Sequence, residues 1–562
     1  MIYKLLKHLK NGTLLHILKR NLLVRYRVKF NDFPLKRSYV IGSRTFIGKN
    51  IQIDSNFEES YCMILQENRS FYRGNYFDIP KLEILKAKKS FVFKTNLDRP
   101  AVLPIGIIND GTVLKIDKSN QKYSIDYSSR TDYKNKYIYL STDDKESITI
   151  SSNKEVLFGN VLYQTQKQKT KKKLVLQIFI DGLSQLVFES DKMRELMPNT
   201  MEFFKNGIDH GNCYSNSEWT LPSSASIFTG CHTDNHGLFH SFKDSQISSN
   251  IRLISEYFQE NDYFTFMVSP VHRQSPLYGY ARGFDRVIYR RNGFTVSDVI
   301  YQFKEQMNAF PNRSTYAFLS IFDLHDVFNK ILPDISLQVQ RSLASHSSVE
   351  RNNTEPVFQK KESFLQSDYE DKISYIDYHL SEIYSLINER FEDEDVTVLI
   401  VSDHGQSFLS DFNHVLGLDR THVKFMLKDS LTSIKEHRSI IQNVDILPTL
   451  LDIAEIDYDK NCVDGTSIFQ GNNVSEFTFS QSIFPGQTYK ACIRNLTYQY
   501  YFESNTKLDN KLIIDIHNAK YSKYDFDNNK VDITNEDVKF ILKYIMDHIN
   551  SGSYLRVNYK SN

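Results

Sequence analysis

Three acidic side chains stand where continuous apolar runs end. Asp181 ends the run LVLQIFID, Asp323 ends TYAFLSIFD, and Asp403 ends VTVLIVSD. Such runs are typical of strands that are buried on both faces of a parallel sheet. Ligand sites in open α/β sheets lie beyond the carboxyl ends of the strands. The three carboxylates are therefore expected to converge at one edge of a sheet, as they would at a metal site.

Histidines accompany these carboxylates. His404 follows Asp403 in SDHG, His325 lies two residues after Asp323 in FDLHD, and His422 stands in RTHVKF. Carboxylate and imidazole groups together suit a divalent cation such as zinc, manganese or magnesium, and the sequence does not choose among them. A single aspartate at a strand end is more often a helix cap than a ligand. The metal hypothesis therefore depends on the group as a whole.

A hydroxyl group that could act as a nucleophile is offered by Thr220, in SEWTLPSSASIFTG. Thr220 stands two residues before Pro222, and proline favours the first turn of a helix. At a helix N-terminus, unpaired N–H groups and the helix dipole stabilise an alkoxide or an anionic ester. A threonine that only caps the helix would give the same pattern, so both interpretations are open at this point.

In their order along the chain, these motifs resemble the alkaline phosphatase superfamily, and within it the sulfatase-like and type I phosphodiesterase enzymes. I-D-G comes first, followed by T-x-P-S with T-G-x-x-x-x-x-H-G, then D-x-H and S-D-H-G. YEDKISYID resembles the helix before the family's D-H-G strand, and VDILPTLLDIA followed by DGTS resembles the segment after the site. The resemblance spans about residues 170–550. It implies an α/β sandwich with a central, mostly parallel sheet flanked by helices.

The resemblance also implies roles for individual residues. Thr220 corresponds to the nucleophile position. Asp181, Asp403 and His404, together with Thr220 itself, correspond to the ligands of the metal that activates this nucleophile. Turnover would then pass through a covalent intermediate on the threonine.

Further positions near the site are less closely matched. Asp323 and His422 correspond to a second metal or to contacts with substrate oxygens, and His325 is expected to bind a substrate oxygen. His414 is a nearer alternative to His422 for substrate binding. Asp323 and His325 are two residues apart, whereas the phosphodiesterases keep four, so the number of metal ions, one or two, stays open.

Position 220 departs from the sulfatase pattern. Sulfatases need a cysteine or serine there, which becomes formylglycine, and usually an arginine at the position of Ser224. Threonine cannot give this aldehyde because of its extra methyl group. We therefore expect a phosphoester hydrolase or a phospho-group transferase, with a cell-surface glycan or a lipid-linked molecule as candidate substrate. The alternatives are a sulfuric ester hydrolase and a catalytically inactive family member that binds glycans.

The elements that must position these residues occupy the second part of the chain, because residues 174–562 form the predicted catalytic domain. Residues 38–165 consist of short segments with alternating apolar and polar residues between Gly, Asn and Asp, which predicts a β-rich accessory domain. The stretch QTQKQKTKKK at 164–173 is basic and lacks apolar residues, which predicts a solvated linker. At 562 residues the chain is too long for one core, in agreement with two or more domains.

Residues 1–37 form a separate basic segment, with eight Lys or Arg and no acid in the first thirty residues. Its leucines recur at roughly helical spacing, which is consistent with an amphipathic helix that contacts an anionic membrane surface through residues 1–30. An ordinary helix packed on the protein would show the same pattern. The apolar stretches are too short and too often interrupted by charge for a signal peptide, so a cytoplasmic protein, in peripheral contact with the membrane, is expected.

Overall composition excludes several other functions. The formal net charge of +1 gives no reason to expect a nucleic acid partner. The five cysteines are odd in number and form no C-x-x-C pair, so neither a disulfide framework nor a structural zinc cluster is predicted. The oligomeric state stays open.

Overall fold

The computed structural model describes most of the chain from residue 81 onwards. The described residues are 45–47, 60–65, 81–118, 121–127, 136–142, 145–188, 192–240, 246–290, 293–325, 335, 339, 361, 363–412, 414–433, 436–470, 476–508, 512–552 and 554–558. The expected amphipathic helix at residues 1–30 lies outside them. No helix of the described part has the length and the apolar composition to span a bilayer.

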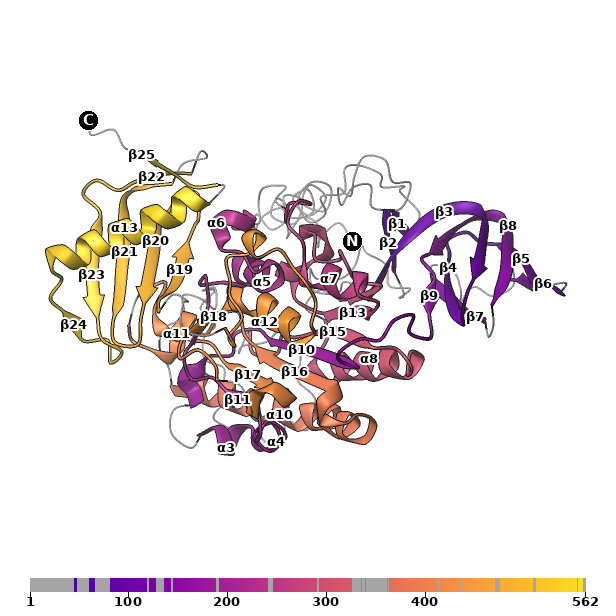
Figure 1. Cartoon of the computed structure of the whole chain (residues 1–562), viewed down its shortest axis with the longest axis horizontal. Helices are drawn as coiled ribbons and strands as arrows, with labels where there is room; N and C mark the ends of the chain where they lie inside the picture. Colours follow the sequence, from indigo (N-terminus) through magenta and orange to yellow (C-terminus); the bar gives the residue numbers. More distant parts are fainter. Residues whose placement is uncertain are drawn as a thin grey trace, which may run out of the picture.

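The centre of the molecule is a parallel sheet (Figure 1). Its parallel strands, in spatial order, are β16 (Val396–Val401), β10 (Leu174–Ile180), β15 (Thr315–Ile321), β13 (Phe264–Ser269) and β14 (Arg286–Tyr289). Beside β16, β17 (Phe425–Lys428) and then β11 (Ile208–Asp209) continue the sheet antiparallel. The prediction of a mostly parallel central sheet is confirmed.

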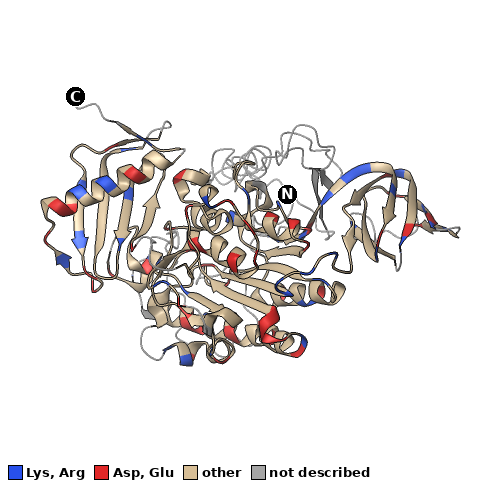
Figure 2. Cartoon of the chain, viewed as in Figure 1, with Lys and Arg blue, Asp and Glu red and all other residues tan. Residues whose placement is uncertain are grey.

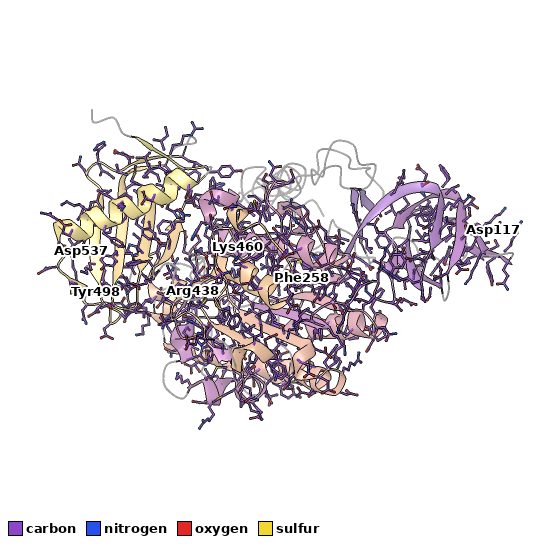
Figure 3. The ribbon with its side chains drawn as sticks, viewed as in Figure 1. Asp117, Phe258, Arg438, Lys460, Tyr498 and Asp537 are labelled. Carbon is purple, nitrogen blue, oxygen red and sulfur yellow. The ribbon has the colours of Figure 1, made fainter. Side chains whose placement is uncertain are left out.

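Helices cover both faces of this sheet because its strands are apolar on both sides. In β10, Leu176 and Ile178 pack into one core cluster, and Val175 and Phe179 pack into the opposite one. The first cluster is closed by α3 (Lys192–Leu196), α4 (Pro198–Phe203), α8 (Val296–Ala309) and α10 (Ser363–Arg390). The second is closed by α5 (Thr220–Thr229), α7 (Ile254–Glu260) and α12 (Ile446–Ile453). Figure 3 labels Phe258 within this second layer. The expected sandwich of sheet and helices is confirmed.

The strand-rich N-terminal part continues the central sheet. Its strands are β1 (Thr45–Ile47), β2 (Ser60–Leu65), β3 (Leu82–Leu97), β4 (Ala101–Ile107), β5 (Val113–Lys118), β6 (Gln121–Asp126), β7 (Lys136–Thr142), β8 (Glu146–Gly159) and β9 (Leu162–Tyr163). The long strand β3 pairs antiparallel with β14, where Ile84 lies opposite Val287. Arg286 of β14 forms a buried ion pair with Glu83 of β3 at this junction. Figure 2 shows lysines along β3 and otherwise a mixture of both charge signs.

A second sheet follows the central one in the chain. It consists of β19 (Thr478–Ser482), β20 (Thr488–Arg494), β21 (Gln499–Lys507), β23 (Lys520–Tyr524) and β24 (Lys530–Val531), and α13 (Asn535–Ser551) packs on it. Figure 3 labels Tyr498 and Asp537 in this part. Two small sheets pair β12 (Cys213–Tyr214) with β18 (Ile441–Gln442) and β22 (Ile513–Asp515) with β25 (Arg556–Asn558). The short helices α6 (Thr233–His236) and α11 (Leu418–Thr421) complete the elements near the site.

The basic stretch before β10 is not solvated throughout. Nζ of Lys172 lies 2.8 Å from Oδ2 of Asp429, and both side chains are 1% exposed or less. The same Nζ donates to the carbonyl of Glu394 at 2.9 Å. The prediction of a solvated linker is therefore wrong at this lysine, because its partners come from segments more than 200 residues further along the chain.

Candidate active site

The three predicted acidic residues follow neighbouring strands at one edge of the sheet. Asp181 comes directly after β10, Asp323 is the second residue after β15, and Asp403 is the second residue after β16. Because β15 and β16 flank β10 in parallel, their carboxyl ends lie side by side. Backbone bonds hold this edge: the N–H of Gly182 donates to Oδ1 of Asp403 at 3.1 Å, and the N–H of Asp181 donates to Ile321 at 2.9 Å.

Thr220 and His404 face each other across this edge. Thr220 is the first residue of α5, is 2% exposed, and its Oγ1 lies 3.1 Å from Nε2 of His404. Nδ1 of His404 lies 2.8 Å from the carbonyl oxygen of Gly405, which can only accept a hydrogen bond. The proton of a neutral His404 is therefore on Nδ1, and Nε2 directs a lone pair at Thr220. The same Nε2 is 3.5 Å from Oδ1 of Asp181 and 3.4 Å from Oδ2 of Asp403.

Three of the four oxygens of the two buried carboxylates, Asp181 and Asp403, lack a hydrogen-bond donor within the described part of the chain that would stabilise their charge. Among the described residues, neither oxygen of Asp181 nor Oδ2 of Asp403 accepts a hydrogen bond, although both side chains are fully buried. Burial raises the pKa of Asp181 well above its usual range and the adjacent charge of Asp403 raises it further, whereas the nearby hydroxyl of Thr220 lowers it by a smaller amount. Buried oxygens of this kind are costly unless they are paired or coordinate a cation. The residues present therefore fit a divalent metal.

His325 belongs to the same group of candidate metal ligands. One ligand atom each from Asp181, His325 and His404 lies within 4.8 Å of the other two. The ring of His325 stacks on Phe322, with centroids 4.5 Å apart. Burial, together with the charges of nearby cationic groups, lowers the pKa of His325 to about 3, so its imidazole is neutral and can act as a ligand. The structure thus places a residue expected at a substrate oxygen among the candidate metal ligands.

His422 lies against other partners. Its Nε2 is 2.6 Å from the carbonyl oxygen of Gly211, and its ring stacks on Tyr214 at a centroid distance of 5.0 Å. The compact group of Asp181, His325 and His404 does not include it. A role for His422 at a second metal stays a prediction without a short contact to this group.

Asp323 and His414 also lie outside this compact group. Asp323 is partly buried, and its backbone carbonyl accepts a hydrogen bond from Nζ of Lys372 at 3.0 Å. Nδ1 of His414 accepts the N–H of Leu416 at 3.2 Å, and its ring packs on Tyr501. The proposed roles of Asp323 and His414 stay predictions.

Arg273 was missed by the sequence analysis. It lies four residues after β13, in the 3-10 helix His272–Gln274, at the same edge of the sheet. Its guanidinium carbon is 5.3 Å from the ring centroid of Trp219, the residue before Thr220, and its charge acts on His325. The strand FTFMVS could have pointed to it, but this run does not end in an acid and therefore gave no signal of a metal site.

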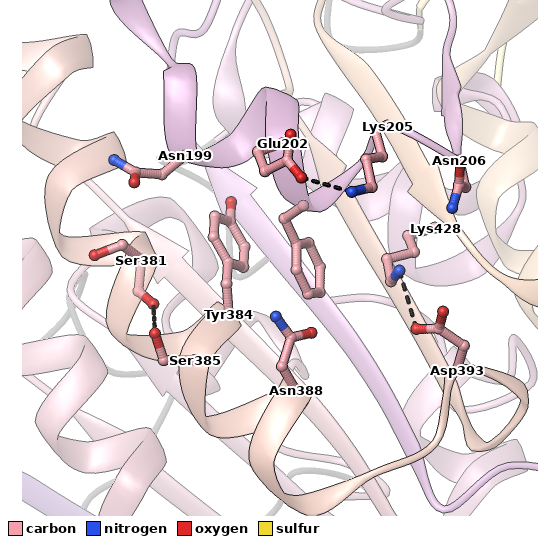
Figure 4. Close-up of a pocket in the computed structure, with 11 residues that line it drawn as sticks. Asn199, Glu202, Lys205, Asn206, Ser381, Tyr384, Ser385, Asn388, Asp393 and Lys428 are labelled. Carbon is pink, nitrogen blue, oxygen red and sulfur yellow. Dashed lines mark hydrogen bonds and ion pairs between the residues drawn. The ribbon is translucent and has the colours of Figure 1, made fainter.

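A polar pocket of about 330 Å³ lies at the opposite edge of the sheet (Figure 4). It is lined by α4, α10 and the residues just before β16, and includes Tyr384, Asn388 and an ion pair of Lys428 with Asp393 at 3.0 Å. None of the predicted site residues lines it. Because strand-end sites in parallel sheets lie at the carboxyl edge, we place the candidate active site at Thr220 and not at this pocket.

Comparisons with known proteins agree with this fold. A family model described as sulfatase matches residues 173–456. A search of curated protein sequences gives no match.

Among solved structures, a protein from a Bacteroides thetaiotaomicron locus for the metabolism of multiple glycosaminoglycans is 13% identical. The alignment covers 68% of this chain and 97% of that one, with a TM-score of 0.51. Ps i-CgsB, solved in complex with k-i-k-neocarrahexaose, is 13% identical over 70% of this chain and 96% of its own, with a TM-score of 0.50. At these identities the likeness shows the fold alone.

Proposed function

This chain belongs to the sulfatase family and is an ester-acting hydrolase, and we propose that it cleaves phosphoesters through a covalent intermediate on Thr220. One observation carries this proposal: Oγ1 of Thr220, at the first position of α5, faces the lone pair of Nε2 of His404 at 3.1 Å. Nε2 of His404 is a candidate metal ligand, so this buried hydroxyl would lie beside the cation, and metal coordination is one of the usual ways to activate a nucleophile.

The metal dependence of the family is compatible with the residues at this site. Asp181, Asp403 and His404 would hold a divalent cation, with His325 and Thr220 as further ligands. When bound, such a cation would lower the pKa of a coordinated hydroxyl and offset negative charge on the ester. Carboxylate and imidazole donors suit zinc, manganese or magnesium.

The residues of the chain supply the remaining parts of the reaction. Oγ1 of Thr220 forms a bond to phosphorus, and the bond from phosphorus to the leaving alcohol breaks. Oγ1 of Thr220 gives up its proton to solvent as it attacks, because the lone pair of Nε2 of His404, 3.1 Å away, would be occupied by the metal. The N-terminus of α5 and the charge of Arg273 favour the anionic ester at this position.

A second displacement returns Thr220 to its free form. Water attacks the phosphorus of the phospho-threonine, the bond from phosphorus to Oγ1 breaks, and the threonine oxygen regains a proton. If an acceptor hydroxyl replaces water, the same step transfers the phospho group to another molecule. We propose that hydrolysis and transfer share this intermediate. Water as the acceptor of the phospho group gives hydrolysis, and another hydroxyl gives transfer.

Hydrolysis of a sulfate ester is the second candidate function, because the matched family model is that of the sulfatases. The side chain at position 220 counts against it. The β-carbon of Thr220 carries a methyl group, so its oxidation cannot give an aldehyde, and the residue must act as an alcohol.

A rate panel on the metal-loaded protein tests both functions. The substrates are p-nitrophenyl phosphate, bis-p-nitrophenyl phosphate and p-nitrophenyl sulfate, each with the wild type, Thr220→Ala and Thr220→Ser. We expect turnover of a phosphate ester that Thr220→Ala lowers by at least about a thousandfold and that Thr220→Ser, which keeps a hydroxyl, largely retains. If only the sulfate is turned over, and in a way that depends on Thr220, the substrate is a sulfate ester and not a phosphoester. Near-normal rates in Thr220→Ala would contradict the assignment of Thr220 as the nucleophile.

A further inference from the structure

The residue before the proposed nucleophile is the only tryptophan of the chain. Trp219 is partly exposed and has an extended backbone, with φ −152° and ψ 163°, as the residue that precedes α5. A single peptide unit joins Trp219 to Thr220, so its side chain starts next to the proposed nucleophile. Most large aromatic residues in the surrounding helix layer are instead buried in the core.

A ring from a distant segment lies next to Trp219, and a third ring lies next to that one. Phe484, which follows β19 of the second sheet, has its ring centroid 6.3 Å from that of Trp219. His240, which follows α6, lies 4.9 Å from Phe484. All three side chains are partly exposed. We call Trp219, His240 and Phe484 the aromatic rim.

A cation lies close to Trp219 of the aromatic rim and acts on the metal group. The guanidinium carbon of Arg273 is 5.3 Å from the ring centroid of Trp219, and its charge also acts on His325 in the metal group. An anionic group at Thr220 would therefore be close to Arg273, and the organic part attached to it would extend over the rings. Pockets of this kind combine aromatic surface with a few polar groups that fix orientation.

We propose that the aromatic rim binds the alcohol part of the ester and that this part is a pyranose ring of a glycan. The C–H faces of a sugar ring pack on aromatic rings, and its hydroxyl groups stay accessible to the imidazole of His240, the indole N–H and solvent. Successive rings of the rim are inclined by 57° and 56°. Inclined rings suit a puckered sugar, whereas a flat nucleobase prefers a parallel slot. This proposal rests on the proposed function, because it places the sugar by the position of the nucleophile.

Trp219 itself reports binding, because it is the only source of tryptophan fluorescence in the chain. The experiment uses the full, metal-loaded chain with Thr220→Ala, so that no ligand is consumed. Glucose 1-phosphate is titrated against glycerol 1-phosphate, which has the same phosphate group and no ring, and against adenosine monophosphate. We expect a saturable fluorescence change with glucose 1-phosphate and an affinity about tenfold higher than that for glycerol 1-phosphate.

Variants of the rim separate stacking from phosphate binding. In the same background, Phe484→Ala should remove most of the preference for glucose 1-phosphate and leave the affinity for glycerol 1-phosphate unchanged. Trp219→Phe keeps an aromatic ring and should retain part of this preference; because this variant has no tryptophan, its binding is measured by calorimetry. Tyr301→Ala, at a residue of α8 that is 58% exposed, is the matched control and should retain the whole preference for glucose 1-phosphate.

The outcomes distinguish this proposal from the proposed function. Equal affinities for the two phosphates, no saturable change with glucose 1-phosphate, or tightest binding of adenosine monophosphate would each overturn the sugar subsite, whatever the rate panel gives. Failure of the Thr220 mechanism would instead appear as turnover that survives in Thr220→Ala. If the rate panel selects sulfate esters, glucose 6-sulfate and methyl sulfate replace the two phosphates in the same comparison.

Discussion

At the scale of single residues, the site is built from charges that the fold does not stabilise by itself. Asp181 has no well-formed hydrogen bond to any described residue, and the Thr220 hydroxyl offsets its charge only in part, yet it is fully buried beside Asp403. Asp377 in α10 is also buried but accepts four hydrogen bonds from Asn199 and Thr200, at 2.6 to 3.0 Å. Of these two buried aspartates, Asp377 is satisfied by donors and Asp181 is left without them. A buried carboxylate without donors is expected of a ligand for a cation.

Replacing Asp181 should therefore separate stability from function. In Asp181→Asn, the metal-free protein should melt at the same temperature as the wild type or above it, because a destabilising buried charge has been removed. The stabilisation that zinc, manganese or magnesium gives to the wild type should be lost, and turnover should fall at least about a hundredfold. Melting curves with and without each metal, together with the rate panel, check this.

Asp377→Asn is the matched control. It replaces an acceptor for four donors, so it should lower the melting temperature and leave the metal-induced shift intact. If Asp181→Asn instead lowered the stability of the metal-free protein as much as Asp377→Asn does, the lone pairs of Asp181 would have a structural partner and the metal assignment would lose its support.

At the scale of elements, one lysine anchors the start of the central sheet. Lys172 precedes β10 and is buried with Asp429, which follows β17, while Thr397 of β16 also donates to this carboxylate. Its neighbours Lys171 and Lys173 form ion pairs but are 45% and 64% exposed. Three consecutive lysines therefore have very different surroundings.

These lysines provide a matched set of variants. Lys172→Ala should lower the free energy of unfolding by about 3–5 kcal/mol, because it leaves the carboxylate of Asp429 buried without its cation. Lys171→Ala and Lys173→Ala should each change it by less than about 1 kcal/mol, since exposed pairs contribute little. Urea unfolding curves measure all three, and equal effects at the three positions would contradict the anchor.

At the scale of the whole molecule, several buried histidines are neutral. Burial lowers the pKa of His236 to about 3 and those of His232, His414 and His422 to about 4. In the unfolded chain these groups have a pKa near 6.5. Between these values the unfolded state binds more protons than the folded state, so stability is full above about pH 6.5 and is lost as the pH falls towards 4. Asp419 opposes this trend, because burial raises its pKa to about 7. Burial also raises the pKa values of Asp181, Asp285 and Asp445.

Because burial also lowers the pKa values of His210 and His325, such histidines outnumber these carboxyl groups among the described residues, and we expect the urea midpoint to fall between pH 7 and pH 5. Each buried histidine should contribute roughly 1–2 kcal/mol of loss at pH 5. His236→Gln should reduce the slope of stability against pH, whereas His517→Gln, at an exposed position, should leave it unchanged. A midpoint that does not change over this range would show that the buried imidazoles do not control acid stability.

The central sheet and the acidic side chains at its edge could be predicted because burial on both faces requires long apolar runs. The runs that end in Asp181, Asp323 and Asp403 are local in sequence, and parallel pairing brings their ends to one edge without further information. The position of Thr220 at the start of α5 was equally local, since Pro222 and the following apolar residues indicate the first turn.

What the tertiary structure alone decided is the partner of each side chain. Phe484 meets Trp219 from 265 positions further along the chain, Arg273 reaches the site from a strand end without an acid, and Lys172 finds Asp429 in the core. Periodicity and strand ends can be predicted from local sequence, because they depend on neighbours within a few residues. Contacts between distant segments depend on how the faces of helices and sheets pack against each other. Such contacts leave no pattern in the local sequence, because the residues in contact share no spacing along the chain.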